Sequence, residues 1–397
     1  MSRALRVVMI APFGIRPKGT LLARMLPLAQ ALARRGHSLA IVAPPVQNPE
    51  DAGTTAVYAG VPVTHAPLPR LPGPVAAPEH AAALLRLALA EGPDLLHLFK
   101  PKGYGGLAAR AARLAPARGR PRPPLVLDAD DWEGPGGWND LLPYPGYARA
   151  LFAWQERDLP RRAAAVTVAS RTLESLVWAM GVPPGRVLYL PNGADPPPAP
   201  PAAAAPGPPA LLLYTRFWEL DLAELAAALV AIHAARPRAR LIVVGRGENG
   251  EERELLALAA RAGFAPMVDY RGWLEPAQIP AVLAEASVAL APARDTLINR
   301  ARCSAKLLEL MGAGLAVVAG DVGEARSFVA HESSGLLVPP GDPAALAAAA
   351  VRLLDDEALR ARLAAGARAA AARFSWDSLA PTAERAYELA LGASRGR

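Results

Sequence analysis

The sequence predicts an α/β fold made of two doubly wound domains, each built on a parallel sheet. Continuous apolar runs alternate with segments of helical periodicity, as expected of parallel strands joined by crossover helices. The apolar runs contain few polar positions, which is typical of strands covered on both faces. A Pro- and Ala-rich stretch at 194–209 interrupts the alternation, which then restarts. We therefore expect domains at 1–193 and 210–375 that are joined by a linker and face a cleft.

The first domain begins with an apolar run at 5–13 that ends in the loop 14–20, "GIRPKGT". The segment 21–36 then has helical periodicity and stops at a glycine, Gly36. Helical segments also separate the apolar runs that follow. Those runs predict strands at 37–45, 93–99, 123–130, 164–170 and 186–193.

The second domain repeats this order. Its apolar runs predict strands at 210–217, 239–247, 266–273, 287–293 and 315–320. Its periodic segments predict helices at 221–237, 251–263, 278–286, 304–314, 342–374 and 375–392. In open α/β sheets ligands bind beyond the carboxyl ends of the strands, so the loops there hold the candidate functional residues.

Composition narrows the class of protein. The 397 residues are 52% hydrophobic and 20% charged, which is a globular composition. No apolar run reaches the roughly 18 residues of a membrane span, and the first residues do not resemble a signal peptide. A single cysteine, Cys303, excludes an intramolecular disulfide and favours a cytoplasmic location.

The formal net charge of +7 favours anionic partners such as nucleotides and phosphates. Peripheral contact with the inner face of a membrane is compatible with this charge. No basic run is interleaved with aromatic residues, so we expect no nucleic-acid partner. Six scattered histidines have no paired ligand spacing, and we expect no metal site.

The segment "GRGENG", 245–250, matches G-x-G-x-x-G between a predicted strand and a predicted helix. One interpretation is a dinucleotide site, although the motif lies in the second βα unit of its domain rather than the first. The other is a tight turn whose glycines let a phosphate or sugar approach the backbone. The sequence leaves both open.

Lysine is rare in this arginine-rich chain, and three of its four lysines follow first-domain strands. Lys18 lies in the loop after the first strand, and Lys100 and Lys102 follow the strand at 93–99. Together with Gly14 and Gly19, they predict a pocket for a phosphate of the donor or acceptor. The alternative for each lysine is an ordinary surface position.

Taken together, these segments resemble the large family 4 of retaining glycosyltransferases. The motifs that carry the resemblance are "LARRGH", "PNGAD", "YTRF", "VVGRG", the block "SAKLLELMGAGLAVVAGDVGE", "GLLVPPGD" and "FSW". The resemblance implies a GT-B fold of two Rossmann-like domains, with the C-terminal helix 376–397 returning to the first. It also implies transfer from a nucleotide sugar of UDP or GDP type, with retention and without a bound metal. The first domain would bind the acceptor, a sugar, lipid or small molecule, and the second the nucleotide sugar.

The resemblance also assigns roles to second-domain residues. Arg216, at a strand end, offers a guanidinium fork to the diphosphate. Lys306 opens a helix whose N-terminal N–H groups also favour an anion, and Glu309 would accept hydrogen bonds from ribose hydroxyls. The alternatives are a surface arginine, a Lys306–Glu309 pair and a solvated glutamate. Further donor-binding candidates are Gly245, Arg246, Gly247, Asn299, Arg300, Ser304, Leu307 and Leu308.

The chain departs from the family at three places. The first acid of the family's E-x7-E pattern is Ala301, and its usual lysine after Arg216 is absent at 221–222. The family's first-domain histidine is replaced by the acidic loop 128–134, "DADDWEG". There Asp130 or Asp131 would face the sugar or accept the acceptor's proton, unless the loop merely caps a helix. Asn192 of "PNGAD" joins the acceptor and phosphate candidates.

These departures keep two alternative functions open. One is a protein that binds a sugar nucleotide but does not transfer the sugar. The other is an isomerase resembling the nucleotide-sugar 2-epimerases.

Overall fold

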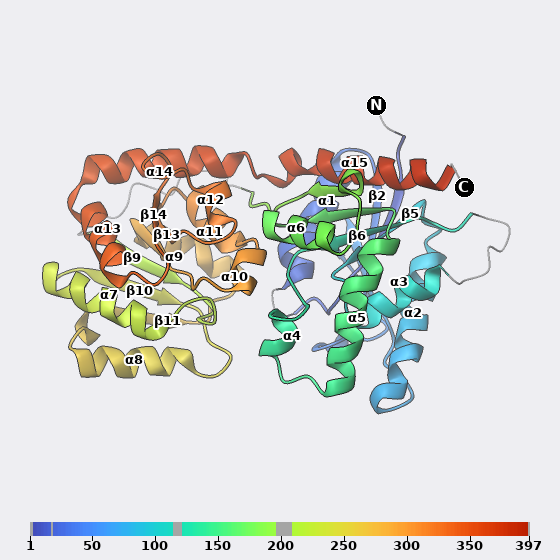
Figure 1. Ribbon diagram of the computed structural model, residues 1–397, viewed down its shortest axis with the longest axis horizontal. Coiled ribbons are helices and arrows are strands. Elements are labelled where there is room, and N and C mark those ends of the chain that lie inside the picture. The colour runs from blue at the N-terminus through green and yellow to red at the C-terminus, as the bar shows by residue number, and fades with distance from the viewer. Residues whose placement is uncertain (1–2, 17–18, 114–120, 196–208, 396–397) are drawn as a thin grey trace. The chain divides into compact units, whose positions relative to one another are not determined.

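The structure is a computed structural model that describes residues 3–16, 19–113, 121–195 and 209–395. The chain forms two compact units, each with its own sheet and core (Figure 1). Unit 1 comprises Met1–Asn192, Ala301–Cys303 and Trp376–Arg397, and unit 2 comprises Gly193–Arg300 and Ser304–Ser375. Lys18 and most of the predicted linker lie outside the described residues.

The sheet of unit 1 has eight strands in the order β3-β4-β2-β1-β5-β6-β7-β8. Their bounds are β1 Arg6–Ile10, β2 Ser38–Ala43, β3 Thr55–Tyr58, β4 Val61–His65, β5 Leu95–Phe99, β6 Leu125–Ala129, β7 Ala165–Val168 and β8 Val187–Tyr189. All neighbours are parallel except β3 and β4, with β1 between β2 and β5. The predicted parallel α/β fold is confirmed in this unit.

The β3–β4 hairpin was not among the predicted elements. Its turn residues, Ala59 and Gly60, have φ values of 45° and 85°. Positive φ at both central positions is the geometry of a tight hairpin turn that usually takes Asn-Gly or Asp-Gly. Alanine at the first position removes that sequence signal.

The helices of unit 1 cover both faces of its sheet. They are the π-helical turn η1 Leu21–Met25, α1 Leu26–Arg34, α2 Ala76–Ala90, α3 Gly103–Ala112, α4 Trp138–Leu141, α5 Gly146–Arg162, α6 Arg171–Ala179 and α15 Trp376–Arg395, with short 3-10 turns η2 Pro49–Asp51, η3 Gly73–Val75 and η4 Pro184–Arg186. Figure 1 shows α2, α3 and α5 side by side, and α15 running along α1. The core joins Met9 and Leu28 to Trp376 and Tyr387, so α15 is part of unit 1.

The sheet of unit 2 has six parallel strands in the order β11-β10-β9-β12-β13-β14. Their bounds are β9 Ala210–Tyr214, β10 Arg240–Val244, β11 Val268–Gly272, β12 Val288–Ala291, β13 Ala316–Gly320 and β14 Leu336–Val338. The first five are the predicted strands, and β14 is an addition. Its three residues are too short to stand out by periodicity.

Four of the described helices of unit 2 begin at a residue whose side chain caps the helix. The elements are α7 Leu222–Ala235, α8 Glu251–Ala262, α9 Ile279–Glu285, α10 Leu297–Ala301, α11 Ala305–Gly312, α12 Ala325–Phe328, α13 Pro343–Asp355 and α14 Glu357–Ala372, with 3-10 turns η5 Ala265–Met267 and η6 Pro276–Gln278. The predicted helix 342–374 is two helices. Asp356 breaks it, because its side chain accepts the N–H of Leu359 and caps α14.

None of the helices in the described part of the chain has the length and apolar character of a membrane span.

Candidate functional site

Each sheet carries charged side chains beyond the carboxyl ends of its strands, where open α/β sheets bind ligands. In unit 2 the first is Arg216, two residues after β9. Its Nη2 donates to Oε1 of Glu248 at 2.5 Å, and the two side chains are 44% and 60% exposed. An exposed ion pair of this kind contributes little free energy, so the guanidinium can exchange its partner for a phosphate.

Lys306 joins Arg216 at this edge through Glu219. The buried Glu219 accepts the backbone N–H of Arg216 at 3.2 Å, and its Oε1 lies 3.9 Å from the Lys306 ammonium. The same ammonium lies 4.9 Å from the centre of the Tyr214 ring. Tyr214 in turn is near Glu309: burial raises the pKa of Tyr214, and the charge of Glu309 raises it further. The structure thus brings Arg216, Lys306 and Glu309 to one edge.

The start of α11 is already capped by the protein. The Oγ of Ser304 accepts the N–H of Leu307 at 3.3 Å, and the donor-binding roles expected of these two residues stay predictions. Leu307 and Leu308 are buried in the core. Ala301, which replaces the family's first acid, is fully buried and brings no polar group.

Two amides of the turn 245–250 are bonded within the protein. Gly247 N–H donates to Glu252 at 3.0 Å, and Asn249 N–H donates to Glu251 at 2.7 Å. Gly245 has φ of 125°, and a Cβ there would overlap the carbonyl oxygen of Thr215. The motif is therefore a tight, close-packed turn, and the phosphate or sugar contact expected at Gly245 and Gly247 stays a prediction.

Two other residues that were predicted to contact the donor, Asn299 and Arg300, lie in the segment before α11 and bind neighbouring residues. The buried Asn299 donates from Nδ2 to the carbonyl oxygens of Glu219 and Arg294, at 2.8 and 2.9 Å. Arg300 forms a two-bond pair with Asp295. Asn299 therefore has a structural role in place of the predicted one. Arg246 is exposed beside the turn.

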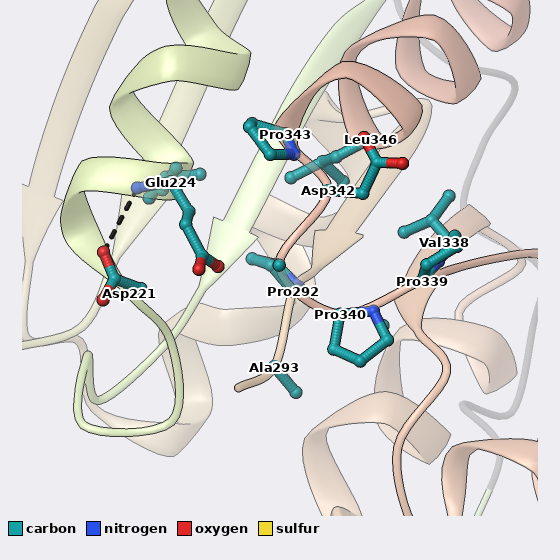
Figure 2. A pocket seen from close by; sticks show the side chains of 13 residues that line it. Asp221, Glu224, Pro292, Ala293, Val338, Pro339, Pro340, Asp342, Pro343 and Leu346 are labelled. Atoms are coloured by element: carbon teal, nitrogen blue, oxygen red, sulfur yellow. Dashed lines mark hydrogen bonds between the residues drawn. The ribbon is translucent and has the colours of Figure 1, made fainter. Parts of the chain in front are cut away.

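A cavity of about 30 Å³ lies between the starts of α7 and α13 (Figure 2). Its lining includes Glu224, Asp342 and four prolines, and Asp221 and Asp342 cap the two helices. The space is about that of one water molecule. It is too small for a nucleotide.

In unit 1 the acidic loop after β6 begins at a buried ion pair. Asp128 and Arg24 are bound through two hydrogen bonds of 2.7 Å, and both side chains are at most 1% exposed. The same guanidinium donates to Leu190 O at 2.7 Å and to Asn192 Oδ1 at 2.9 Å. Asn192, a predicted phosphate contact, is thus held by Arg24.

The rest of the loop meets the loop after β5 in a group that we call the charged network. Lys100 Nζ lies 2.5 Å from Asp131, 3.3 Å from Asp130 and 3.4 Å from Glu133, and Lys102 Nζ lies 2.5 Å from Glu133. Lys102 also faces the rings of Tyr144 and Phe152. The members of the network are Lys100, Lys102, Asp130, Asp131, Glu133 and Glu156.

Burial governs the charges in this network. Burial lowers the pKa of Lys100, but Asp130, Asp131 and Glu133 outweigh it, so the pKa lies well above its ordinary value. For Glu156, burial raises the pKa well above its ordinary value, and Glu133 adds to the rise. This environment favours the neutral form of Glu156. Lys100 and Lys102 differ from the phosphate pocket that the sequence predicted, because both ammonium groups are buried and paired with carboxylates.

Other sequence candidates lie nearby. Asp130 also accepts a hydrogen bond from the hydroxyl of Thr20 at 3.0 Å, which links the network to the start of η1. A Cβ at Gly14 would lie 2.5 Å from Asn48 Oδ1, so this glycine allows a close approach of two loops. Gly19 accepts the N–H of Ala23 at 2.9 Å.

Sequence patterns missed Glu219, Tyr214, Arg24 and Glu156. Glu219 follows Arg216 by three residues, so its position carried a local signal. Arg24 and Glu156 lie within helical patterns where charged residues are common, and only their neighbours in space distinguish them. Within the described ranges, no group of three or more His, Cys, Asp or Glu residues has the arrangement of a metal site.

Comparison with known proteins places this geometry in a family. Residues 19–193 match the glycosyl transferase 4-like domain, and residues 208–356 match the glycosyl transferases group 1 domain. A phosphatidyl-myo-inositol mannosyltransferase of Mycolicibacterium smegmatis is 28% identical over 405 residues, covering 98% of this chain and 95% of that protein. A D-inositol 3-phosphate glycosyltransferase of Thermobispora bispora is 35% identical over 264 residues, covering 61% and 59%.

Among solved structures, sucrose-phosphate synthase of Thermosynechococcus elongatus has the same fold. Its TM-score is 0.76 at 21% identity, and the match covers 98% of this chain and 100% of that one. The family matches cover both domains, and the two curated relatives are named as glycosyltransferases. The chain therefore belongs to family 4 of the glycosyltransferases and has their GT-B fold.

Proposed function

We propose that the protein transfers a sugar from a nucleotide diphosphate of UDP or GDP type to an acceptor hydroxyl, with retention and without a metal ion. Unit 2 binds the donor and unit 1 the acceptor. The observation that carries the proposal is the pair of cations at the carboxyl edge of unit 2, Arg216 and Lys306, which Glu219 joins. Fixed positive charge is what a departing diphosphate needs in its transition state.

In the proposed reaction, the bond between the anomeric carbon and the donor phosphate oxygen breaks. The nucleoside diphosphate leaves with the electron pair, and the acceptor oxygen bonds to the same face of the carbon. The acceptor's proton passes to the departing phosphate oxygen, so atoms and charge balance. Arg216 and Lys306 hold the phosphates, and Glu309 accepts hydrogen bonds from ribose hydroxyls.

The names of the relatives support a ring-shaped polyhydroxyl acceptor. One acts on phosphatidyl-myo-inositol and the other on D-inositol 3-phosphate, so both acceptors contain an inositol ring. We propose an acceptor of this kind for unit 1. If it is a lipid, transfer takes place at a cytoplasmic membrane surface, which the net charge of +7 favours.

Replacing Arg216 tests the donor assignment. Arg216→Ala should lower the transfer rate on the order of 100-fold, because a main phosphate contact is lost. Arg236→Ala is the matched control, because Arg236 is also an exposed arginine paired with a carboxylate and lies before β10, at the opposite edge of the same sheet. Equal turnover in the two variants would contradict the assignment.

A thermal-shift screen with UDP-, GDP- and ADP-sugars identifies the donor. A nucleotide sugar that binds the folded protein raises its melting temperature by mass action. Binding without hydrolysis or transfer would indicate an inactive binding protein. A new sugar nucleotide formed without acceptor would indicate an isomerase.

A further inference from the structure

We infer that unit 1 selects a neutral polyol rather than a phosphate-bearing group at the loop after β6, and that Asp131 accepts a hydrogen bond from its hydroxyl. The inference rests on the proposed function, which assigns acceptor binding to unit 1. The inference concerns the charge of the part of the acceptor that contacts the charged network.

The balance of charge in the network is the first argument. Two ammonium groups, Lys100 and Lys102, face the three carboxylates of Asp130, Asp131 and Glu133, and the environment of Glu156 favours its neutral form. A phosphate here would meet a surplus of negative charge in a poorly screened setting. Like charges brought together at a recognition surface disfavour binding.

The lysines are also not available to a phosphate. Lys100 and Lys102 side chains are each 5% exposed, and Glu133 is 3% exposed. Turning Lys100 toward an incoming anion would leave buried carboxylates without their counter-charge, which is strongly destabilising. The lysines therefore hold the carboxylates in place.

The loop that carries the carboxylates is packed around Trp132. This indole is 8% exposed and donates from Nε1 to Pro135 O at 2.8 Å. A Cβ at Gly134 or Gly137 would overlap Trp132. The backbone of the loop is thus packed around its own tryptophan, and its carboxylates are held by the lysines.

Asp131 is the carboxylate placed to meet a ligand. Among the described members of the network its side chain is 24% exposed, against 8% for Asp130 and 3% for Glu133. A carboxylate has about four acceptor sites, so the bond from Lys100 leaves others for a hydroxyl. Glu156, which is 99% buried, is not placed to meet a ligand in this way.

A transfer assay with two matched acceptors tests the inference. The full chain, with the nucleotide sugar that stabilises it most, is offered myo-inositol and myo-inositol 1-phosphate. We expect kcat/KM to be at least about tenfold higher for the neutral ring, and Asp131→Asn to reduce that preference about tenfold. A preference for the phosphate that Asp131→Asn leaves unchanged would overturn the inference.

Glu156→Gln is the matched control. It makes the same carboxyl-to-amide change within the network, but at a side chain that is 99% buried and whose environment favours the neutral form, so the ratio of the two kcat/KM values should stay as in the wild type. A change in this ratio equal to that of Asp131→Asn would contradict the charge argument. A third variant, Lys18→Met, tests whether Lys18 recognises phosphate. If the wild-type protein prefers the phosphate-bearing ring and Lys18→Met loses that preference, phosphate recognition belongs to Lys18 and the inference is overturned.

If the protein transfers sugar to neither ring, the affinity for each ring is measured instead by calorimetric titration at millimolar ring concentration. Tighter binding of the phosphate, or binding of neither ring, overturns the inference. Donor hydrolysis and the donor-induced thermal shift are measured on the same protein, so failure of the acceptor assignment is distinguished from failure of the proposed function.

Discussion

The two units hold similar charged side chains in opposite settings. In unit 1, Lys100 and Lys102 are 5% exposed and bound to carboxylates. In unit 2, Arg216 is 44% exposed, and its partner Glu248 is 60% exposed. Both sets of charged side chains follow strands at the carboxyl edge of a sheet, so their position in the fold does not explain the difference in their exposure.

The difference lies in what each cation can do. A buried cation cannot leave its carboxylate without stranding a charge in a medium of low dielectric constant. An exposed cation exchanges one partner for another at little cost. The buried charges of unit 1 are therefore fixed by their partners, whereas Arg216 of unit 2 can exchange its partner.

Breaking the most buried pair should have the largest effect. Arg24→Met leaves Asp128 without its counter-charge and should lower the free energy of unfolding by about 3–5 kcal/mol, measured by urea denaturation. Arg236→Met, at an exposed pair, should lower it far less. Adding Asp128→Leu to Arg24→Met should restore much of the loss, and equal losses in the two single variants would contradict the comparison.

The turn in unit 2 offers a second test. Gly245→Ala should lower the free energy of unfolding by about 3 kcal/mol, because the new Cβ overlaps Thr215 O and φ is 125°. Gly263→Ala is the control, since Gly263 has φ of 84° with no atom within 4 Å of its Cβ position. It should lose only about 1–2 kcal/mol. If Gly245→Ala binds the donor less tightly but is as stable as the wild type, the result would favour the interpretation in which the glycines let a phosphate or sugar approach the backbone.

The buried His97 should make the stability of unit 1 depend on pH. This buried histidine lies 3.0 Å from Tyr387 Oη, and burial together with the charge of Arg24 lowers its pKa to about 3. Between pH 6.5 and 3 the unfolded chain binds the extra proton, so stability falls as pH falls, by about 1.4 kcal/mol per unit. His97→Gln should flatten this dependence by about 2 kcal/mol between pH 6.5 and 5. Parallel curves for variant and wild type would contradict the assignment.

The smallest effect is expected at the exposed pair of unit 2. Glu248→Gln should leave the melting temperature nearly unchanged and tighten donor binding up to several-fold, because Arg216 loses a competing carboxylate. Donor titration by calorimetry measures this change, and Glu285→Gln, at an exposed pair before β12, is the control. Weaker donor binding in Glu248→Gln would show that Glu248 itself contacts the donor.

The sequence predicted the architecture well, since strands and helices in this chain have clear periodicity. It predicted five of the strands of unit 2 but missed β14 and the β3–β4 hairpin, where short length and an Ala-Gly turn weaken the pattern. Among site residues, it singled out Arg216, Lys306 and Glu309, which the structure brings to one edge. Their roles in donor binding stay predictions.

The sequence did not show which partner each candidate residue has within the protein. Lys100 and Lys102 were expected to meet phosphate, and Ser304 and Gly247 to meet the donor. Each is occupied by the protein itself, through Asp131, Glu133, the Leu307 N–H and Glu252 respectively. A sequence pattern shows that a lysine follows a strand, but it does not show which carboxylate faces it.

The sequence by itself determined the two α/β domains, the strand-end loops that carry the site and the family, because these depend on local periodicity and on motif order. Only the tertiary structure decided which charges are buried and which are exposed. The partners that decide this lie far apart in the chain, with Arg24 and Asp128 separated by 104 residues and Lys100 and Asp131 by 31. Burial changes both the charge state and the freedom of a side chain, so the role of each lysine and arginine depends on contacts that local sequence does not specify.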